Sequence, residues 1–226
     1  MLIEINGTYV VSVETKLLFK EKLDYIKGVL DDISSKLLKS ENLNEDTYWS
    51  ELGDFTNLNS EDFEFHNSIA NELKHQARNF PQIIYKSLLV SVYSILETTL
   101  SEILHFTEMN HSKKIKYKNL KKSGSEIDSI INFFELVHEI EFKSIEKQQN
   151  SLKEYANIRN NIVHRNGNLK DENPDRKNKI IKFAQSCTDL NIENELLIIS
   201  NSKFVTDFIS FISSFGLDFF DKIKLM

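Results

Sequence analysis

Two short runs of alternating apolar and polar residues open the chain. Residues 2–5 read Leu-Ile-Glu-Ile, residues 6–7 read Asn-Gly, and residues 8–13 read Thr-Tyr-Val-Val-Ser-Val. Alternation predicts strands, and Asn-Gly between two such runs predicts a β-hairpin with a two-residue turn. A third strand is predicted from Glu195 to Ser200, and the hairpin could pair with it in a small sheet.

Helical periodicity dominates the rest of the chain. Apolar residues recur three and four positions apart over residues 14–38, and another helix is predicted over residues 60–78. Pro81 then restarts the chain as a long helix reaching about Met109, because proline is tolerated in a first helical turn. This helix is apolar on more than one face, so we expect it to be central. Further helices are predicted over residues 125–142, 144–165, 179–187 and 203–224.

We therefore expect a mainly α fold, a helical bundle with a small β element. Residues 39–60 are acidic, rich in Asn and irregular, which makes them the best candidate boundary. The predicted division is an N-terminal hairpin with a helical extension, residues 1–78, and a helical domain, residues 79–226. The two could also form one continuous globular unit. Glu and Asp residues interrupt the most apolar stretches, so we expect core helices and no membrane partner.

Composition limits the classes of function. The 28 Lys and Arg residues against 34 Asp and Glu residues give a formal net charge of −6, so any nucleic-acid site has to be local. Cys187 is the single cysteine and the start of the chain lacks the pattern of a secretory signal, so we expect a cytoplasmic protein. The motifs HExxH, GxxxxGK and GxGxxG are missing, so we expect no metal and no cofactor.

One segment carries a recognisable set of chemical groups. It reads Arg159-Asn160-Asn161-Ile162-Val163-His164 and stands at the end of a predicted helix that stops at Asn-Gly. At about 100° per residue, Asn160 and His164 share one stripe and Arg159 lies at its edge. An arginine can grip a phosphate at two points, an imidazole can exchange protons near neutral pH, and an amide can orient either group or a ribose hydroxyl.

These groups are sufficient to cleave RNA through its own 2′-hydroxyl. In this hypothesis His164 takes or gives the proton, and Arg159 stabilises the charge that builds up on the phosphate oxygens. A second interpretation is that Arg159 and His164 form an ordinary solvated helix end above the core.

The Arg-Asn-x-x-x-His motif resembles the signature of HEPN domains, helical ribonucleases common in bacterial toxin–antitoxin, antiviral and CRISPR-linked systems. The resemblance covers about residues 79–165. It implies a helical bundle, a homodimer whose two motif helices meet in one composite site, and metal-independent endoribonuclease activity. It also implies a possible antitoxin or inhibitor protein as partner. Tyr93 and Glu97 are similar to the aromatic and acidic residues that the family often places on an earlier helix. The resemblance implies that Glu97 orients Arg159, although a lone Glu in an apolar helix could equally be a surface residue or a structural ion-pair partner.

Other basic residues are candidates for contacts with RNA. Residues 113–122 contain six lysines, among them Lys113 and Lys114, and this cluster could guide RNA, although such runs are usually solvated loops. Arg165 and Lys170 stand next to the motif and are the better candidates for phosphate neighbours. Two other classes stay open: a non-catalytic module that binds RNA or a protein, and a purely structural helical dimer.

Overall fold

The computed structural model describes residues 2–5, 8–40, 45–53, 60–110, 115–120 and 124–225, without the side chains of 37–40, 45–47, 75 and 78. The mainly α fold class is confirmed. The helices are α1 (Val13–Ser40), α2 (Glu45–Leu52), α3 (Ser60–Asn110), α4 (Glu126–His138), α5 (Glu146–Arg165), α6 (Pro174–Ser186) and α7 (Ser202–Lys222). The strands are β1 (Leu2–Ile5), β2 (Thr8–Val11), β3 (Leu190–Glu193), β4 (Leu196–Ile199) and β5 (Lys224–Leu225).

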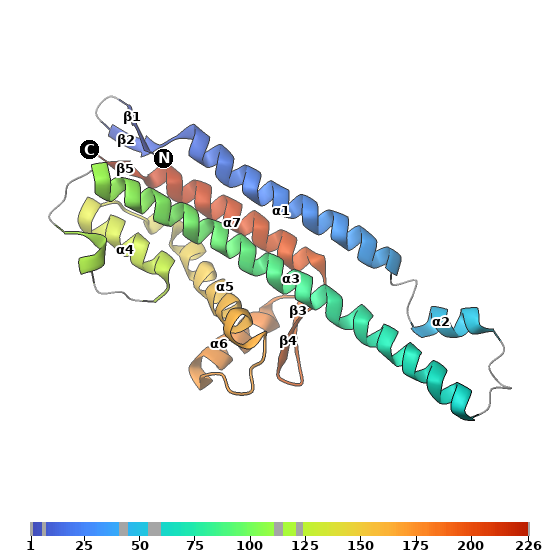
Figure 1. The fold of residues 1–226 in the computed structure, drawn as a ribbon. Helices are drawn as coiled ribbons and strands as arrows, with labels where there is room; N and C mark the ends of the chain where they lie inside the picture. Colours follow the sequence, from blue (N-terminus) through green and yellow to red (C-terminus); the bar gives the residue numbers. More distant parts are fainter. Residues whose placement is uncertain are drawn as a thin grey trace.

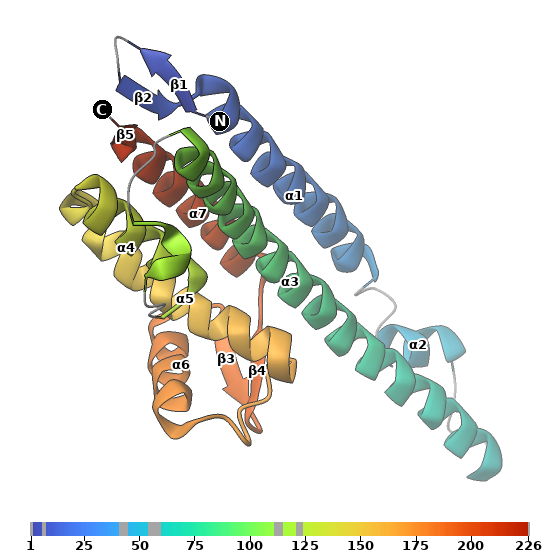
Figure 2. The same ribbon diagram turned by 60° about the vertical axis from the view of Figure 1, so that its left-hand side comes forward.

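Three long helices form the centre of the fold. Helices α1, α3 and α7 lie side by side and contact one another, while α4, α5 and α6 lie on the side of α3 away from α1 (Figures 1 and 2). Helix α7 contributes phenylalanines to the core, of which Phe208, Phe215 and Phe219 are completely buried. The ring of Phe219 stacks on that of Phe142, with 4.7 Å between centroids. Phe142 lies just before α5, so this stack joins α7 to the segment that leads into α5.

Helix α3 is unbroken, whereas the sequence predicted a new helix at Pro81. A proline inside a helix removes one backbone hydrogen bond. Helix α3 is held on both sides of Pro81, by α2 near its N-terminus and by the bundle further along (Figure 1). These contacts stabilise one continuous helix, which passes through the predicted boundary between residues 78 and 79.

The length and composition of α3 would also allow it to cross a membrane. It is the one described helix that meets this test, which core helices of soluble proteins meet as well. Leu89, Val92 and Leu96 on its bundle-facing side are completely buried among other residues of the chain.

The strands form two separate small sheets. Strands β1 and β2 pair antiparallel, with Ile5 opposite Thr8, which confirms the N-terminal hairpin; its turn, Asn6-Gly7, lies outside the described residues. The order of this sheet is β1-β2-β5, so its third strand comes from the C-terminus. Strand β4 pairs with β3 in a second hairpin.

The expected pairing of the N-terminal hairpin with residues 195–200 is therefore wrong. Asn194 and Glu195 both have positive φ, of 48° and 63°, which suits a tight turn between β3 and β4. Helix α7 begins directly after β4, and its 21 residues span about 30 Å. It carries the chain from the β3–β4 hairpin to the opposite end of the bundle, where β1, β2 and β5 lie (Figure 2).

Two helix boundaries also differ from the prediction, and caps explain both. Helix α4 ends at His138 because Glu139 adopts a left-handed conformation, so the helix does not extend to residue 142. Helix α6 begins at Pro174 and not near residue 179, because the side chain of Asn173 accepts hydrogen bonds from the first turn and proline suits that turn.

Candidate functional site

Helix α5 carries the Arg-Asn-x-x-x-His motif and packs against α3. Ile158 and Ile162 are buried, and the ring of Tyr155 lies 4.5 Å from that of Phe208 on α7. These apolar contacts fix the rotation of α5 about its axis. As a result Arg159 is half-buried beside α3 and His164 is exposed at the end of the helix.

Arg159 joins α5 to α3. Its Nη2 donates a hydrogen bond of 2.9 Å to Oε2 of Glu97, and its Nη1 donates one of 2.9 Å to Oδ1 of Asn160. The centre of the guanidinium lies 5.4 Å from the centroid of the Tyr93 ring, which allows a cation–π contact. Tyr93, Glu97 and Asn160 thus surround Arg159.

The surroundings of this pair are partly dehydrated. Burial raises the pKa of the Glu97 carboxyl, Arg159 opposes this effect, and Glu126 raises the pKa further. Burial, followed by the charge of Glu97, likewise raises the pKa of the Tyr93 hydroxyl. The side chains of Arg159 and Glu97 are 21% and 22% exposed, so water screens the attraction between their charges less than in a surface pair. The two hydrogen bonds use one N–H group on each of Nη1 and Nη2, and the second N–H group of each nitrogen is left for a ligand. The Nε atom of Arg159 is buried and has no partner among the described residues.

His164 is placed differently from Arg159. It is exposed and forms no hydrogen bond with any described residue. Asn160 lies one helical turn before His164, but its amide oxygen is directed to Arg159. The helix end therefore presents an anchored cation, an amide and a free imidazole.

The C-terminus of α5 is held by Lys86 of α3, a residue that the sequence reasoning missed. Lys86 is 5% exposed, and its Nζ donates a hydrogen bond of 3.1 Å to the carbonyl of Asn166. Burial lowers the pKa of this amine. Asn166 caps the helix with a left-handed φ of 52°. A cation at this position is favourable, because the last carbonyls of a helix carry partial negative charge.

Gly167 provides a test of this cap. Its φ is +87°, and a Cβ added there would lie 2.8 Å from Nζ of Lys86. We expect Gly167→Ala to lower the free energy of unfolding by about 1 to 3 kcal/mol, because of backbone strain and the displaced lysine. Urea denaturation measures this change. Gly28→Ala is the control: the glycine lies within α1, an added Cβ meets nothing within 4 Å, and the change should stabilise by up to about 1 kcal/mol. Equal stability of the two variants would contradict the role of the cap.

A buried carboxylate, Glu172, folds the loop after α5 back onto the helix. Its oxygens accept hydrogen bonds of 3.0 Å from Nδ2 of Asn161 and from the backbone N–H of Asn173. Arg165 Nε and Arg176 Nη1 both lie 3.5 Å from the same carboxylate. The Glu172 side chain is 3% exposed. Burial raises its pKa, but the hydrogen bonds and the two arginines outweigh burial, so that the net pKa is lowered.

Glu172 should therefore make stability depend on pH. Because its pKa is lower in the folded state, its charge stabilises the fold above the unfolded pKa of about 4.3, and this contribution is lost as the pH falls through the folded pKa. We expect Glu172→Gln to lose about 1.5 to 3 kcal/mol at pH 7 and less below pH 4, as measured by urea denaturation. Asp171→Asn removes the same charge at an exposed neighbour and should stay within about 0.5 kcal/mol. A constant difference between Glu172→Gln and wild type at every pH would contradict this account.

The residues predicted to contact RNA have different positions. Arg165 is partly occupied by Glu172, with 38% of its side chain exposed, and Lys170 is exposed. Lys113 and Lys114 lie outside the described residues. Among the described residues, no group of three or more His, Cys, Asp or Glu side chains could hold a metal ion.

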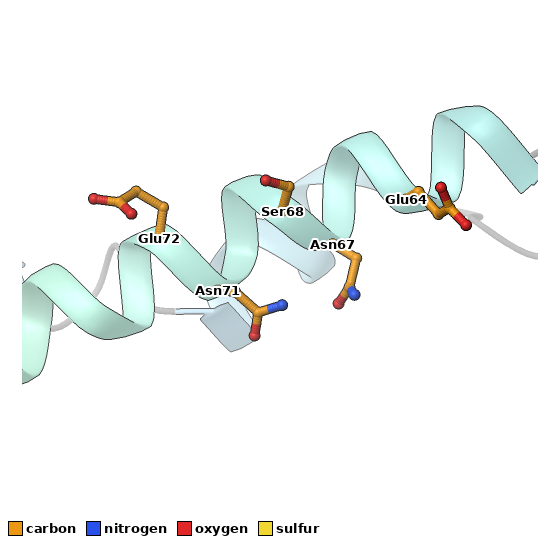
Figure 3. Close-up of a pocket in the computed structure, with 5 residues that line it drawn as sticks. All are labelled: Glu64, Asn67, Ser68, Asn71 and Glu72. Atoms are coloured by element: carbon orange, nitrogen blue, oxygen red, sulfur yellow. The ribbon is translucent and has the colours of Figure 1, made fainter.

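A surface hollow lies on the part of α3 that projects beyond the bundle. It is lined by Glu64, Asn67, Ser68, Asn71 and Glu72, all from this one helix (Figure 3). These side chains point away from the helix and include two carboxylates and no cation. The hollow therefore does not suit a phosphate backbone.

Comparisons with known proteins give no relative for this chain. No family model matches it, and no curated protein and no solved structure shows a significant match.

Proposed function

We propose that the chain is a metal-independent endoribonuclease of the HEPN type, acting on RNA in the cytoplasm. The observation that supports this most is the arrangement around Arg159. Glu97 and Asn160 fix the guanidinium beside a helix end that exposes His164. A cation held in place before the reaction stabilises developing negative charge without reorganisation.

The proposed reaction uses the ribose of the substrate. The 2′-hydroxyl oxygen attacks the adjacent phosphorus, and the bond from phosphorus to the 5′ oxygen breaks. One product ends in a 2′,3′-cyclic phosphate and the other begins with a 5′-hydroxyl. One proton leaves the 2′-hydroxyl and one is delivered to the 5′ oxygen, and His164 exchanges one of them. Arg159 stabilises the charge on the non-bridging phosphate oxygens.

The proposed active form is a homodimer. A single chain offers one motif histidine, whereas the reaction uses both a base and an acid. Two copies with their motif helices together would supply both, as the resemblance to HEPN domains implies. A toxin-like or antiviral role, restrained by an inhibitor protein, would fit such an activity. Light scattering should show a dimer at working concentrations, and a strictly monomeric protein that still cuts RNA would contradict the composite site.

A non-catalytic module that binds RNA or a protein is the second candidate. The observation that favours it is the state of the motif: Arg159 already donates to Glu97 and Asn160, and His164 has no hydrogen bond with a described residue to orient its ring. A module of this kind would bind RNA through the same residues and leave it intact.

Cleavage without a divalent metal separates the two candidates. Purified protein is incubated with mixed cellular RNA in EDTA, and the fragment ends are identified. The nuclease proposal predicts fragments that end in 2′,3′-cyclic phosphate. RNA that is bound but intact would favour the binding module, and ends with 5′-phosphate would contradict the proposed chemistry.

A further inference from the structure

Basic residues gather on the segment that leads from the motif helix into α6. Residues 165–182 contain six Lys and Arg against three Asp and Glu, although acidic residues are in excess over the whole chain. The basic residues are Arg165, Lys170, Arg176, Lys177, Lys179 and Lys182, and the acidic ones are Asp171, Glu172 and Asp175. This local excess of positive charge directly follows His164.

Two of these arginines are brought together by Glu172. Arg165 and Arg176 each approach its buried carboxylate through one nitrogen, at 3.5 Å. Their side chains are 38% and 46% exposed, so both guanidinium groups also reach solvent. One carboxylate balances one of the two positive charges. The pair therefore keeps a net positive charge and free N–H donors, held in place by an anchor beneath the surface.

Helix α6 extends this pair of arginines into a row of basic residues. Lys179 and Lys182 follow Arg176 at steps of three residues, which places them on neighbouring positions of one side of the helix. Both are exposed and form no hydrogen bond or ion pair with a described residue. Ile180 and Phe183, four residues after Arg176 and Lys179, are buried, so the basic residues lie along the edge of the buried side of α6.

The charge and the stacking capacity of this surface depend on two other residues of α6. Asp175 is the one acidic residue of the helix, and it shares a surface hollow with Lys179 and Lys182. It lowers the positive charge of the row but leaves the row cationic. Phe183, the one aromatic residue of α6, is buried.

We infer that the row Arg165, Arg176, Lys179 and Lys182 is a track for the backbone of single-stranded RNA that extends away from His164. The choice of RNA as ligand rests on the proposed function. The 2′-hydroxyl must line up with the bond that breaks, which an A-form duplex prevents, so the strand is single. Because α6 exposes no aromatic ring for stacking, the track contacts phosphates and tolerates any base sequence.

A probe that cannot be cleaved tests the track separately from catalysis. A fluorescent 2′-O-methyl oligouridine of about 16 nucleotides lacks the attacking hydroxyl, and its anisotropy reports binding over a range of salt concentrations. The test variant is Arg176→Gln with Lys179→Gln and Lys182→Gln. The control is Lys20→Gln with Lys22→Gln and Lys27→Gln, three exposed lysines of α1 that change the net charge equally.

We expect the test variant to bind about tenfold or more weakly at about 0.15 M salt, with the control close to wild type. The slope of log affinity against log salt should become shallower by about 2, since each phosphate contact on a single strand contributes about 0.7. The double variant Lys179→Gln with Lys182→Gln touches no observed contact, and its slope should change by about 1.4. It keeps the test valid if the loss of Arg176 unfolds the loop.

Failure of the track and failure of the nuclease proposal give different results in these experiments. Equal affinity of test and control variants, or wild type that does not bind the probe, overturns the track. If the test variant alone binds weakly and RNA stays intact in EDTA, the track stands and the nuclease proposal fails. If wild type cuts RNA and the test variant binds the probe as the control does, only the track fails.

Discussion

Replacing His164 with alanine is expected to lower the rate of RNA cleavage by about 10² to 10⁴-fold, the contribution typical of a general acid or base. The affinity for RNA should change little, because a single exposed ring is lost and the arginines and lysines around the site remain. Cleavage of a labelled RNA under single-turnover conditions measures the rate, and anisotropy with an uncleavable analogue measures the affinity.

The exposed position of His164 makes this variant easy to interpret. The ring forms no hydrogen bond with a described residue, so the alanine variant should unfold at the same temperature as wild type. His105→Ala, at an exposed histidine of α3, is the control and should cleave at the wild-type rate. A His164→Ala protein that is as active as the control would remove this histidine from the mechanism.

Replacing Arg159 with lysine is expected to lower the cleavage rate by about 10² to 10³-fold, although the charge is kept. A guanidinium can hold Glu97 and Asn160 with two nitrogens and still donate to a phosphate, whereas an ammonium is a single point without the planar fork. Single-turnover cleavage again gives the rate. A loss of affinity with an unchanged rate at saturation would instead favour a role in binding.

A second Arg→Lys substitution, outside the motif, is the control for Arg159→Lys. Arg78→Lys, at an arginine of α3 outside both the motif and the track, keeps the charge and should leave the single-turnover rate at saturating RNA within about twofold of wild type. If both exchanges slow the reaction equally, Arg159 has no special position in the site.

Local patterns predict much of this fold. The three-and-four spacing of apolar residues gives α1, α5 and α7 nearly to their observed ends, and Asn166-Gly167 correctly ends the motif helix. The pairing of β2 with β5 joins the two ends of the chain, and no local pattern encodes it. The continuity of α3 through Pro81 depends on neighbours that the sequence around the proline does not reveal.

The sequence likewise predicts one part of the candidate site and does not predict the other part. The spacing of Arg159, Asn160 and His164 follows from one helix, so the sequence is sufficient to group them. Lys86 and Glu172 act on backbone atoms and loop residues whose positions exist only in the folded chain. One signal was present in the sequence: Asn161 lies three residues after Ile158 on the buried side of α5, and a buried amide requires partners. Its Nδ2 donates hydrogen bonds to Glu172 and to the carbonyl of Asn168.

If the substrate's own 2′-hydroxyl attacks the phosphorus, removing that hydroxyl at one nucleotide of the RNA should protect one bond from cleavage. After a cut is mapped in a defined single-stranded RNA, the same RNA is made with one 2′-deoxy nucleotide on the 5′ side of that bond. We expect cleavage at this bond to disappear while cuts elsewhere continue at the same rate. Continued cleavage at the substituted bond would show that another nucleophile attacks the phosphorus and would contradict the proposed mechanism.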